Sequence, residues 1–436
     1  MIEALTQRGH EVTFFSVGRV DLSMRPHLRW SRSVGVRQVE LINSPNVPGT
    51  TGDPDWQSSH PVVERLTEQV LDQVQPDVVH IHELSGHCLS ILGLIQARGI
   101  PSVVSLHNYW PICPQLNLVD ACGAACEDYA EGEKCTRCHW LPPVEDRFWV
   151  EQVKSVLIVT PIFRPVRRLR SFARQLVQRY KLGPPQPPGW GVPRYTAAAF
   201  AQRRYTAIKL LNQANVIHAL SSRSAAVLIY YGILPERIKV IPISLFNIDQ
   251  IQPSAARHIT YPVVFGYRGN LSYIKGVHYL IEAFAQLDQT RGRLVIYGSG
   301  EPNYEAQLRR LARGLNVSFE GEYSAKELTK INSQIDVGVI PSICDETFCL
   351  VGIEFLQSRI PVIATRMGGM LDYVEDRVTG LLVNPRDVNS LRDAMSLFVN
   401  SPPLMARMRA QIRQLPSMDQ ITDSMVSLYN EIVKDV

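Results

Sequence analysis

The sequence predicts an α/β protein made of two domains, each built on a parallel β-sheet. Its 436 residues exceed what one hydrophobic core normally accommodates, so two domains of roughly 200 residues are expected. The second half alternates short apolar strands with amphipathic helices, and short glycine-containing loops join them. This alternation is typical of right-handed βαβ units and therefore of parallel sheets.

Composition is that of an ordinary globular protein, with 45% hydrophobic and 20% charged residues. No apolar run approaches the roughly 18–20 residues that a membrane-spanning helix needs. The opening residues MIEALTQRGH lack the charged-then-apolar layout of a secretory signal. We therefore expect a cytoplasmic protein, either free or attached peripherally to the inner face of the membrane.

Residues 260–415 are expected to form a Rossmann-like domain. The apolar runs predict strands within 261–271, 293–301, 316–323, 336–342 and 360–365. The amphipathic runs between them predict helices at 276–287, 304–315, 325–334 and 350–358.

Residues 1–250 show the same alternation less regularly and are expected to form a second α/β sheet. The expected strands lie within 10–17, 76–83, 101–107, 214–221 and 236–244, and the expected helices at 1–9 and 87–99. We expect a linker at 246–262 and a C-terminal helix, 416–436, that crosses back to the first domain.

The chain begins inside its first helix. A doubly wound domain normally opens with a strand and a glycine-rich turn, so the N-terminal domain is expected to lack its first strand. A version extended upstream should then be more stable and more active.

Two glutamates eight positions apart bracket an apolar stretch in PSICDETFCLVGIEF (341–355). Ligands of open α/β sheets bind outside the carboxyl ends of the strands, and Glu346 follows the strand at 336–342 directly. Glu354 falls within the next helix. The amides of Phe348, Cys349, Leu350 and Val351 near the helix start suit a phosphate, and the carboxylates suit sugar hydroxyls. Spacing alone also allows Glu354 to be a solvated surface residue.

The segment PSICDETFCLVGIEFLQSRIPVIATRMGGMLDYV resembles the E-x7-E segment of the retaining glycosyltransferases of family 4. Further similar segments follow in family order, namely FGYRGNLSYIKGVHYLIEAF, RLVIYGSGE, VSFEGEYSAKEL and GLLVNPRDVNSLRDAM. The first half is similar through RGHEVTFFS, PDVVHIHE, VSLHNYW and ANVIHALSSRSAAVLIYYGILPERIKVIP. The resemblance implies the GT-B fold of two facing Rossmann-like domains.

The resemblance also implies the reaction. A sugar would move from a nucleoside-diphosphate sugar, bound by the C-terminal domain, to a glycan or lipid-linked acceptor held mainly by the N-terminal domain. The process would be cell-surface polysaccharide or glycoconjugate biosynthesis, and no cofactor is needed for catalysis.

The same resemblance implies roles for individual residues. Glu346 would face the donor sugar, and Glu354 would hold the ribose. Lys275 matches the lysine of the phosphate clamp in GNLSYIKG. His107 would contact the donor sugar, although a lone histidine at a strand end can also be structural.

Five further residues are candidates for the donor site. Asn270 stands where the family has an arginine, so Arg268 is either its substitute or a solvated strand-end residue. Gly298 and Gly300 let the backbone pass close to the nucleotide or simply form a tight turn. Glu322 is a weaker candidate near the base.

The segment 110–142 is rich in cysteine. Cys122, Cys126, Cys135 and Cys138 form a C-x3-C-x8-C-x2-C pattern, with Cys113 as a spare. In a cytoplasmic protein this suggests structural zinc, which would brace the loop after His107. Unliganded thiols and an iron–sulfur cluster are the alternatives, and His139 could replace one ligand.

No Asp or Glu occurs between Gln152 and Pro235, and the basic segment 152–210 is expected to contain an amphipathic helix at 164–181. An apolar stripe formed by Val166, Leu169, Ala173, Leu176 and Tyr180 lies apart from the basic residues Arg167, Arg168, Arg174 and Arg179. The helix either packs on the first domain or docks on an anionic membrane surface.

Two other functions compete with glycosyl transfer. A nucleotide-sugar epimerase of the same fold would use a similar donor site without a separate acceptor. A non-catalytic protein could bind nucleic acid or metal through the basic and cysteine-rich segments. Paired carboxylates at a helix start argue against a nucleic-acid partner, so none is expected.

Overall fold

The computed structural model describes residues 1–23, 25–33, 35–50, 52–138, 194–245, 248–253 and 262–434. The chain divides into two compact units. The first comprises Met1–Ala219, Leu228–Lys239 and Ser424–Val436, and the second comprises Leu220–Val227 and Val240–Asp423.

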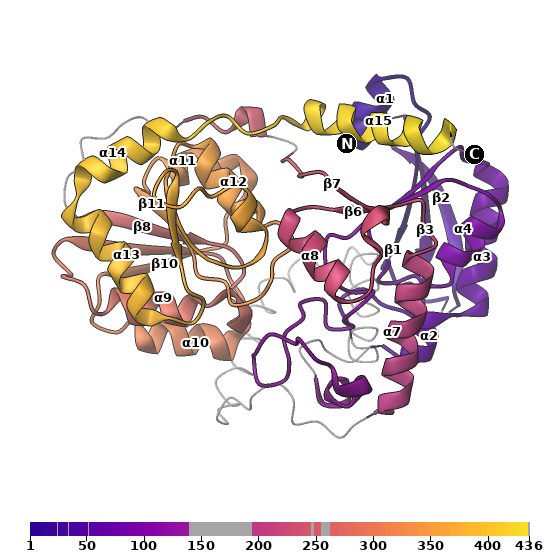
Figure 1. Ribbon diagram of the computed structural model, residues 1–436, viewed down its shortest axis with the longest axis horizontal. Coiled ribbons are helices and arrows are strands. Elements are labelled where there is room, and N and C mark those ends of the chain that lie inside the picture. The colour runs from indigo at the N-terminus through magenta and orange to yellow at the C-terminus, as the bar shows by residue number, and fades with distance from the viewer. Residues whose placement is uncertain are drawn as a thin grey trace, which may run out of the picture. The chain divides into compact units, whose positions relative to one another are not determined.

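The second unit is built on a sheet that, among the described residues, has six parallel strands in the order β10-β9-β8-β11-β12-β13 (Figure 1). The strands are β8 (Val263–Arg268), β9 (Gly292–Tyr297), β10 (Val317–Gly321), β11 (Val337–Ile340), β12 (Val362–Thr365) and β13 (Gly380–Val383). The helices are α9 (Val277–Phe284), α10 (Pro302–Leu311), α11 (Leu328–Asn332), α12 (Leu350–Gln357), α13 (Val388–Asn400) and α14 (Pro402–Gln411). The strands and helices predicted for 260–365 are confirmed.

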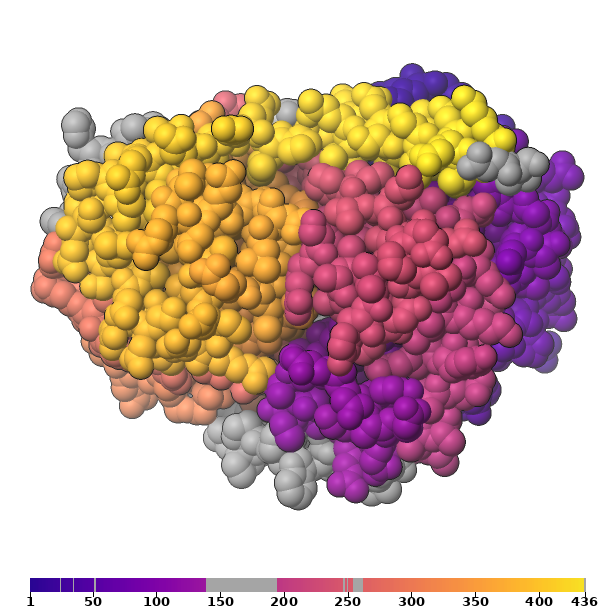
Figure 2. Space-filling model, viewed as in Figure 1, coloured from indigo at the N-terminus to yellow at the C-terminus, as the bar shows by residue number. Residues whose placement is uncertain are grey.

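Helices cover both faces of this sheet, which explains why its central strands β8, β11 and β12 are buried along nearly their whole length. Successive residues of a strand point to opposite faces. Phe265 of β8 packs in one core with α9, α10 and α13, whereas its neighbour Val264 packs in the other core with Phe355 of α12. In Figure 1, α9 and α10 accordingly lie on one side of the sheet and α11 and α12 on the other. The orange and yellow C-terminal elements form much of the surface of this unit in Figure 2.

In the first unit the described strands form two sheets, where the sequence predicted one. A sheet of order β1-β3-β2 pairs β1 (Thr13–Val17) parallel and β2 (His27–Ser33) antiparallel with β3 (Val36–Ile42). The second sheet has the order β4-β5-β6-β7, with β4 (Val79–Ile81), β5 (Ser102–Ser105), β6 (Val216–Ala219) and β7 (Ile238–Val240). The sequence did not predict the hairpin of β2 and β3, because β2 is largely exposed and has no apolar run.

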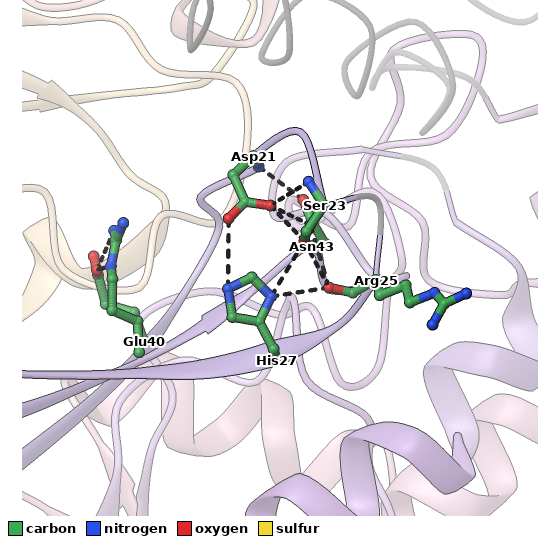
Figure 3. A network of polar contacts seen from close by, with 7 residues as sticks. Asp21, Ser23, Arg25, His27, Glu40 and Asn43 are labelled. Carbon is green, nitrogen blue, oxygen red and sulfur yellow. Dashed lines mark hydrogen bonds and ion pairs between the residues drawn. The ribbon is translucent and has the colours of Figure 1, made fainter. Parts of the chain in front are cut away.

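A polar network joins the loop after β1 to the end of β3 (Figure 3). The side-chain amide of Asn43 donates to Asp21 Oδ1 at 2.7 Å, and its oxygen accepts from the Asp21 amide at 2.8 Å. Asn43 has a φ of 53°, a conformation that Asn tolerates better than most residues. Burial raises the pKa of Asp21, but hydrogen bonds from Ser23 and Asn43 outweigh burial and lower it. The network therefore fixes the course of the chain between β1 and β2.

The remaining described helices are α1 (Ile2–Gln7), α2 (Pro54–Ser58), α3 (Pro61–Val74), α4 (Ile91–Ala97), α7 (Ala197–Leu211), α8 (Ser222–Tyr230) and α15 (Met418–Lys434). The last part of α15 belongs to the first unit. There the Tyr429 hydroxyl is hydrogen-bonded to Nδ1 of His80 on β4, and Lys239 pairs with Glu431 at 3.2 Å.

Several predicted features fall partly or wholly outside the described residues. These are His139, the amphipathic helix at 164–181 and most of the linker at 246–262. Among the helices that are described, none combines the length and the hydropathy required to cross a membrane.

Candidate active site

The two glutamates of the E-x7-E segment lie where the sequence predicted. Glu346 is in the loop after β11, and Glu354 is one turn into α12. Cys349 is the N-cap of this helix and has a φ of 66°, which is uncommon for a residue other than glycine. Phe348 is buried, while Leu350 is exposed at the first helical position. The loop therefore turns sharply at the start of α12, beside the carboxyl end of β11.

Glu346 is paired with Lys275, which comes from the turn after β8. The Lys275 ammonium lies 2.8 Å from Glu346 Oε2, and the Ser342 hydroxyl donates to Oε1. Burial raises the pKa of Glu346, but Lys275 and Ser342 outweigh burial and lower it. Burial likewise lowers the pKa of Lys275, and the Glu346 carboxylate more than reverses this. Both groups are therefore charged at neutral pH.

Glu354 is paired with Arg268, the last residue of β8. A guanidinium nitrogen lies 2.8 Å from Glu354 Oε2, and the Arg268 side chain is 0% exposed. The pair is close, but its geometry does not make a hydrogen bond, and among the described residues the three guanidinium nitrogens have no hydrogen-bond partner. Burial raises the pKa of Glu354, against the opposing effect of Arg268. Arg268 is thus a buried partner of Glu354, and the alternative of a solvated strand-end residue is wrong.

Close backbone packing explains why the turn after β9 has glycine at positions 298 and 300. A Cβ atom at Gly298 would lie 1.9 Å from the Gly269 carbonyl oxygen, and one at Gly300 would lie 1.8 Å from that of Leu271. The turns after β8 and β9 are therefore in direct backbone contact, which larger residues would prevent.

The other two donor-site candidates lie in or next to these turns. Glu322 accepts a hydrogen bond from Ser299 at 2.6 Å, between the two glycines. Asn270 is exposed, and its carbonyl accepts from Tyr267 at 2.8 Å.

Residues that sequence reasoning missed support the Glu346 loop. The Gly369 amide donates to the Glu346 carbonyl at 2.7 Å. The Gly368 amide donates to Asp345 at 3.1 Å, and Arg223 forms an ion pair with the same carboxylate at 2.8 Å. The signal for the glycines was their place in RMGGM, directly after β12. No local pattern pointed to Arg223, because it is far away in sequence.

In the first unit, His107 follows β5 and belongs to a row of histidines at the ends of neighbouring strands. Its Nε2 lies 3.0 Å from Nδ1 of His82, and the rings of His82 and His80 stack with their centroids 3.9 Å apart. Ser105 connects His80, at 2.6 Å, to His218, at 2.5 Å. The sequence singled out only His107, although VHIHE, SLH and VIHALS place a histidine on or after each strand.

A small cavity lies at this edge of the sheet. Its lining includes His82, Glu83, His107 and Asn108, and the Asn108 amide donates to Glu83 at 2.7 Å. The cavity therefore combines a carboxylate, an amide and two imidazoles.

The cysteine-rich segment groups different cysteines from those that the spacing suggested. Cys113, Cys126, Cys135 and Cys138 line one cavity, whereas Cys122 is exposed and is not part of its lining. Within the described part of the chain, no three His, Cys, Asp or Glu side chains already surround a point where they could hold a metal ion.

Comparison with known families matches both halves of the chain. Residues 251–415 match the family described as "Glycosyl transferases group 1", and residues 1–131 match "Glycosyltransferase Family 4". Together these matches cover more than half of the chain. The chain belongs to the family 4 glycosyltransferases.

Individual relatives of this glycosyltransferase match over shorter stretches. Alpha-D-kanosaminyltransferase from Streptomyces kanamyceticus is 31% identical over 180 residues, 39% of this chain and 46% of that protein. D-inositol 3-phosphate glycosyltransferase from Geodermatophilus obscurus is 28% identical over 227 residues, 48% of this chain and 50% of that protein. The chain thus spans about half the length of these curated relatives.

Solved structures show that the glycosyltransferase has the GT-B fold. Sucrose-phosphate synthase from Thermosynechococcus elongatus superposes with a TM-score of 0.65 at 20% identity, over 100% of this chain and 92% of that chain. Anabaena Alr3699/HepE, solved in complex with UDP and glucose, superposes with a TM-score of 0.55 at 17% identity, over 92% of this chain and 86% of that chain.

Proposed function

We propose that the protein is a retaining hexosyltransferase that moves a sugar from a nucleoside-diphosphate sugar to a glycan or lipid-linked acceptor. The observation that carries this proposal is the pair of ion pairs at the carboxyl ends of β8 and β11. Lys275 with Glu346 and Arg268 with Glu354 lie on either side of the start of α12. Solved complexes of Anabaena Alr3699/HepE with UDP and UDP-glucose support a nucleoside diphosphate as the ligand class.

The charges of this site suit a sugar diphosphate. Cleavage of the bond between the sugar and the diphosphate leaves negative charge on the phosphate oxygens, and a fixed cation stabilises that charge without reorganisation. Lys275 supplies such a cation, and its side chain is 29% exposed and so open to a ligand. Amides at the start of α12 add to the same stabilisation.

The two carboxylates bind different sugars of the donor, namely the transferred sugar and the ribose. Glu346 keeps its charge next to Lys275 and faces the donor sugar. Glu354 accepts hydrogen bonds from the ribose hydroxyls, and Arg268, whose nitrogens lack hydrogen-bond partners among the described residues, gains polar neighbours when a nucleotide binds. We assign the acceptor to the first unit, where the cavity beside His107 offers Glu83 as a hydroxyl acceptor.

A donor panel tests the proposal. Purified protein is mixed with UDP-, GDP-, ADP- and dTDP-sugars, and thermal shift identifies the base. The donor that binds is then incubated with and without candidate acceptors, and the released sugars and products are analysed. We expect a sugar product only when the acceptor is present, with the anomeric configuration retained. Conversion of the donor alone into an epimer would favour the epimerase, and an inverted product would contradict retention.

If the acceptor is lipid-linked, we propose that the protein also attaches peripherally to an anionic membrane surface. The segment that would carry it, 164–181, lies outside the described residues. Sedimentation with vesicles should increase with anionic lipid and decrease with salt, because surface attraction is screened over about 8–10 Å at physiological ionic strength. Changing Arg167, Arg168 and Arg174 together to Gln should reduce the fraction of protein that sediments with anionic vesicles. Equal sedimentation with neutral vesicles would make a soluble acceptor the better proposal.

A further inference from the structure

Four thiols from one surface insert converge on a single small cavity. Cys113, Cys126, Cys135 and Cys138 line it, and its interior of about 10 Å³ accommodates one water-sized sphere. Figure 2 shows this insert in purple at the molecular surface. Tyr231, directly after α8, donates a hydrogen bond to the Cys126 carbonyl.

Local backbone structure brings these cysteines together. A β-bridge between Val119 and Ala125 folds the insert back on itself, and the Cys126 amide donates to Leu118 at 2.8 Å. The Cys138 thiol donates to the Val119 carbonyl at 3.4 Å. The same fold leaves Cys122 in the exposed tip between the paired residues.

Two arginines of α7 are buried beside this cluster. Arg203 is 1% exposed and donates to the side chain of Gln57 and to the carbonyls of Trp110 and Pro111. Arg204 is 5% exposed, lines the thiol cavity and donates to the Ile112 carbonyl.

Among the described residues, the hydrogen-bond partners of both arginines are neutral. The Arg204 guanidinium also stacks 3.6 Å from the centroid of the Tyr129 ring. In the part of the chain that the structure describes, neither arginine forms an ion pair with a carboxylate. Buried charges are costly unless an opposite charge compensates them. We therefore expect the two buried guanidinium groups to have an anionic neighbour that compensates their charge.

We propose that Cys113, Cys126, Cys135 and Cys138 bind one Zn²⁺ as a tetrahedral tetrathiolate centre. Each thiol releases its proton to solvent when the ion binds, so four thiolates and one divalent cation leave a net charge of about −2. Arg203 and Arg204 neutralise this charge. Because no three of the side chains surround a common point as they lie, binding requires rotation of cysteine side chains within the cavity.

Four thiols match the coordination number of a single zinc ion, which needs about 2.3 Å to each sulfur. The centre would lie in the chain segment after His107. Arg203 holds the carbonyls of Trp110 and Pro111, and Cys113 follows two residues later. The ion would therefore stabilise the loop that His107 begins.

Zinc analysis of cysteine variants tests this ligand set. The full chain is purified without chelator, incubated with Zn²⁺ alone, separated from free ion by gel filtration and analysed for metal. We expect about one zinc per chain in the wild type and in Cys122→Ser. Cys113→Ser and Cys135→Ser should each lose most of the zinc. Cys122→Ser is the matched control, because it removes a thiol of the same insert that lies outside the cavity.

Cobalt spectroscopy keeps the proposal testable if a variant fails to fold. Wild-type protein loaded with Co²⁺ alone should show thiolate-to-cobalt charge transfer and the visible d–d bands of a tetrahedral tetrathiolate site. Arg204→Gln should bind Zn²⁺ more weakly than wild type, by roughly 10–100-fold, as is typical of changes next to metal ligands. Wild-type protein without zinc or a cobalt spectrum would overturn the proposal. Zinc retained by Cys113→Ser but lost by Cys122→Ser would overturn the ligand set.

Discussion

Arg268 and Glu354 form an ion pair, 2.8 Å apart, in which the arginine side chain is wholly inaccessible to solvent. The guanidinium also lies 4.3 Å from the centroid of the Phe355 ring. The second glutamate of the E-x7-E segment thus has two functions in our proposal. It compensates a buried charge of the sheet, and it accepts hydroxyl protons from a nucleotide.

Glu354→Ala should therefore lower both stability and nucleotide affinity. An unpaired buried guanidinium costs about 3–5 kcal/mol, which calorimetry should detect as a lower melting temperature. Binding of the free nucleoside diphosphate should weaken by about 1.5–3 kcal/mol, because a charged acceptor is lost.

The double variant Arg268→Leu with Glu354→Leu separates these effects. It removes both charges, so stability should recover much of what Glu354→Ala loses, while nucleotide affinity stays low. A double variant that binds nucleotide as tightly as wild type would contradict the proposed role of Glu354.

Glu346→Gln should reduce turnover while leaving nucleotide affinity nearly unchanged, because this carboxylate is assigned to the donor sugar. Lys275→Met should reduce both, since the ammonium is assigned to the diphosphate. Lys326→Met is a matched control, because Lys326 is exposed on the surface of the same unit. Steady-state kinetics measure turnover, and calorimetry measures nucleotide affinity, with the donor that the thermal-shift panel selects. Equal effects of the Glu346 and Lys275 variants on nucleotide affinity would contradict this division.

Two buried histidines should make the fold sensitive to acid. Burial lowers the pKa of His87 from 6.5 to about 4, and burial together with Arg386 lowers that of His278 from 6.5 to about 4. Between pH 4 and pH 6.5, the unfolded chain therefore binds more protons at these two histidines than the folded chain does. Their contribution to stability is therefore complete above pH 6.5 and is lost as the pH falls toward 4.

Thermal melts across this pH window test the effect. The melting temperature of His87→Phe should fall less steeply from pH 6.5 to 4 than that of wild type, because one titrating group is removed. His10→Asn, at an exposed position, should follow the wild-type curve. A slope for His87→Phe as steep as that of wild type would show that His87 does not titrate in this range.

Tyr429→Phe should destabilise the first unit. Its hydroxyl is hydrogen-bonded to His80, and a typical hydrogen bond contributes about 0.5–1.5 kcal/mol to the free energy of unfolding. Denaturant unfolding measures the loss. Tyr205→Phe provides the control, since Tyr205 is 64% exposed. Equal stability of both variants would mean that the contact with His80 contributes nothing measurable.

Sequence by itself determined the secondary structure of residues 262–365 and the family. Short apolar runs, helical periodicity and glycine-containing loops are local signals, and they placed Glu346 after a strand and Glu354 in a helix correctly. The resemblance to the family came instead from motif segments such as PSICDETFCLVGIEF, and family comparison confirmed it.

Tertiary structure decided which side chains meet. Lys275 with Glu346 and Arg268 with Glu354 are separated by more than 70 residues, and no periodicity encodes such contacts. Cys113 joined the thiol cluster and Cys122 was left out because a β-bridge folded the insert back. Spacing records only distance along the chain, whereas a cluster depends on how strand ends and loops pack in space. Which side chains lie together at each site was therefore decided by packing in three dimensions.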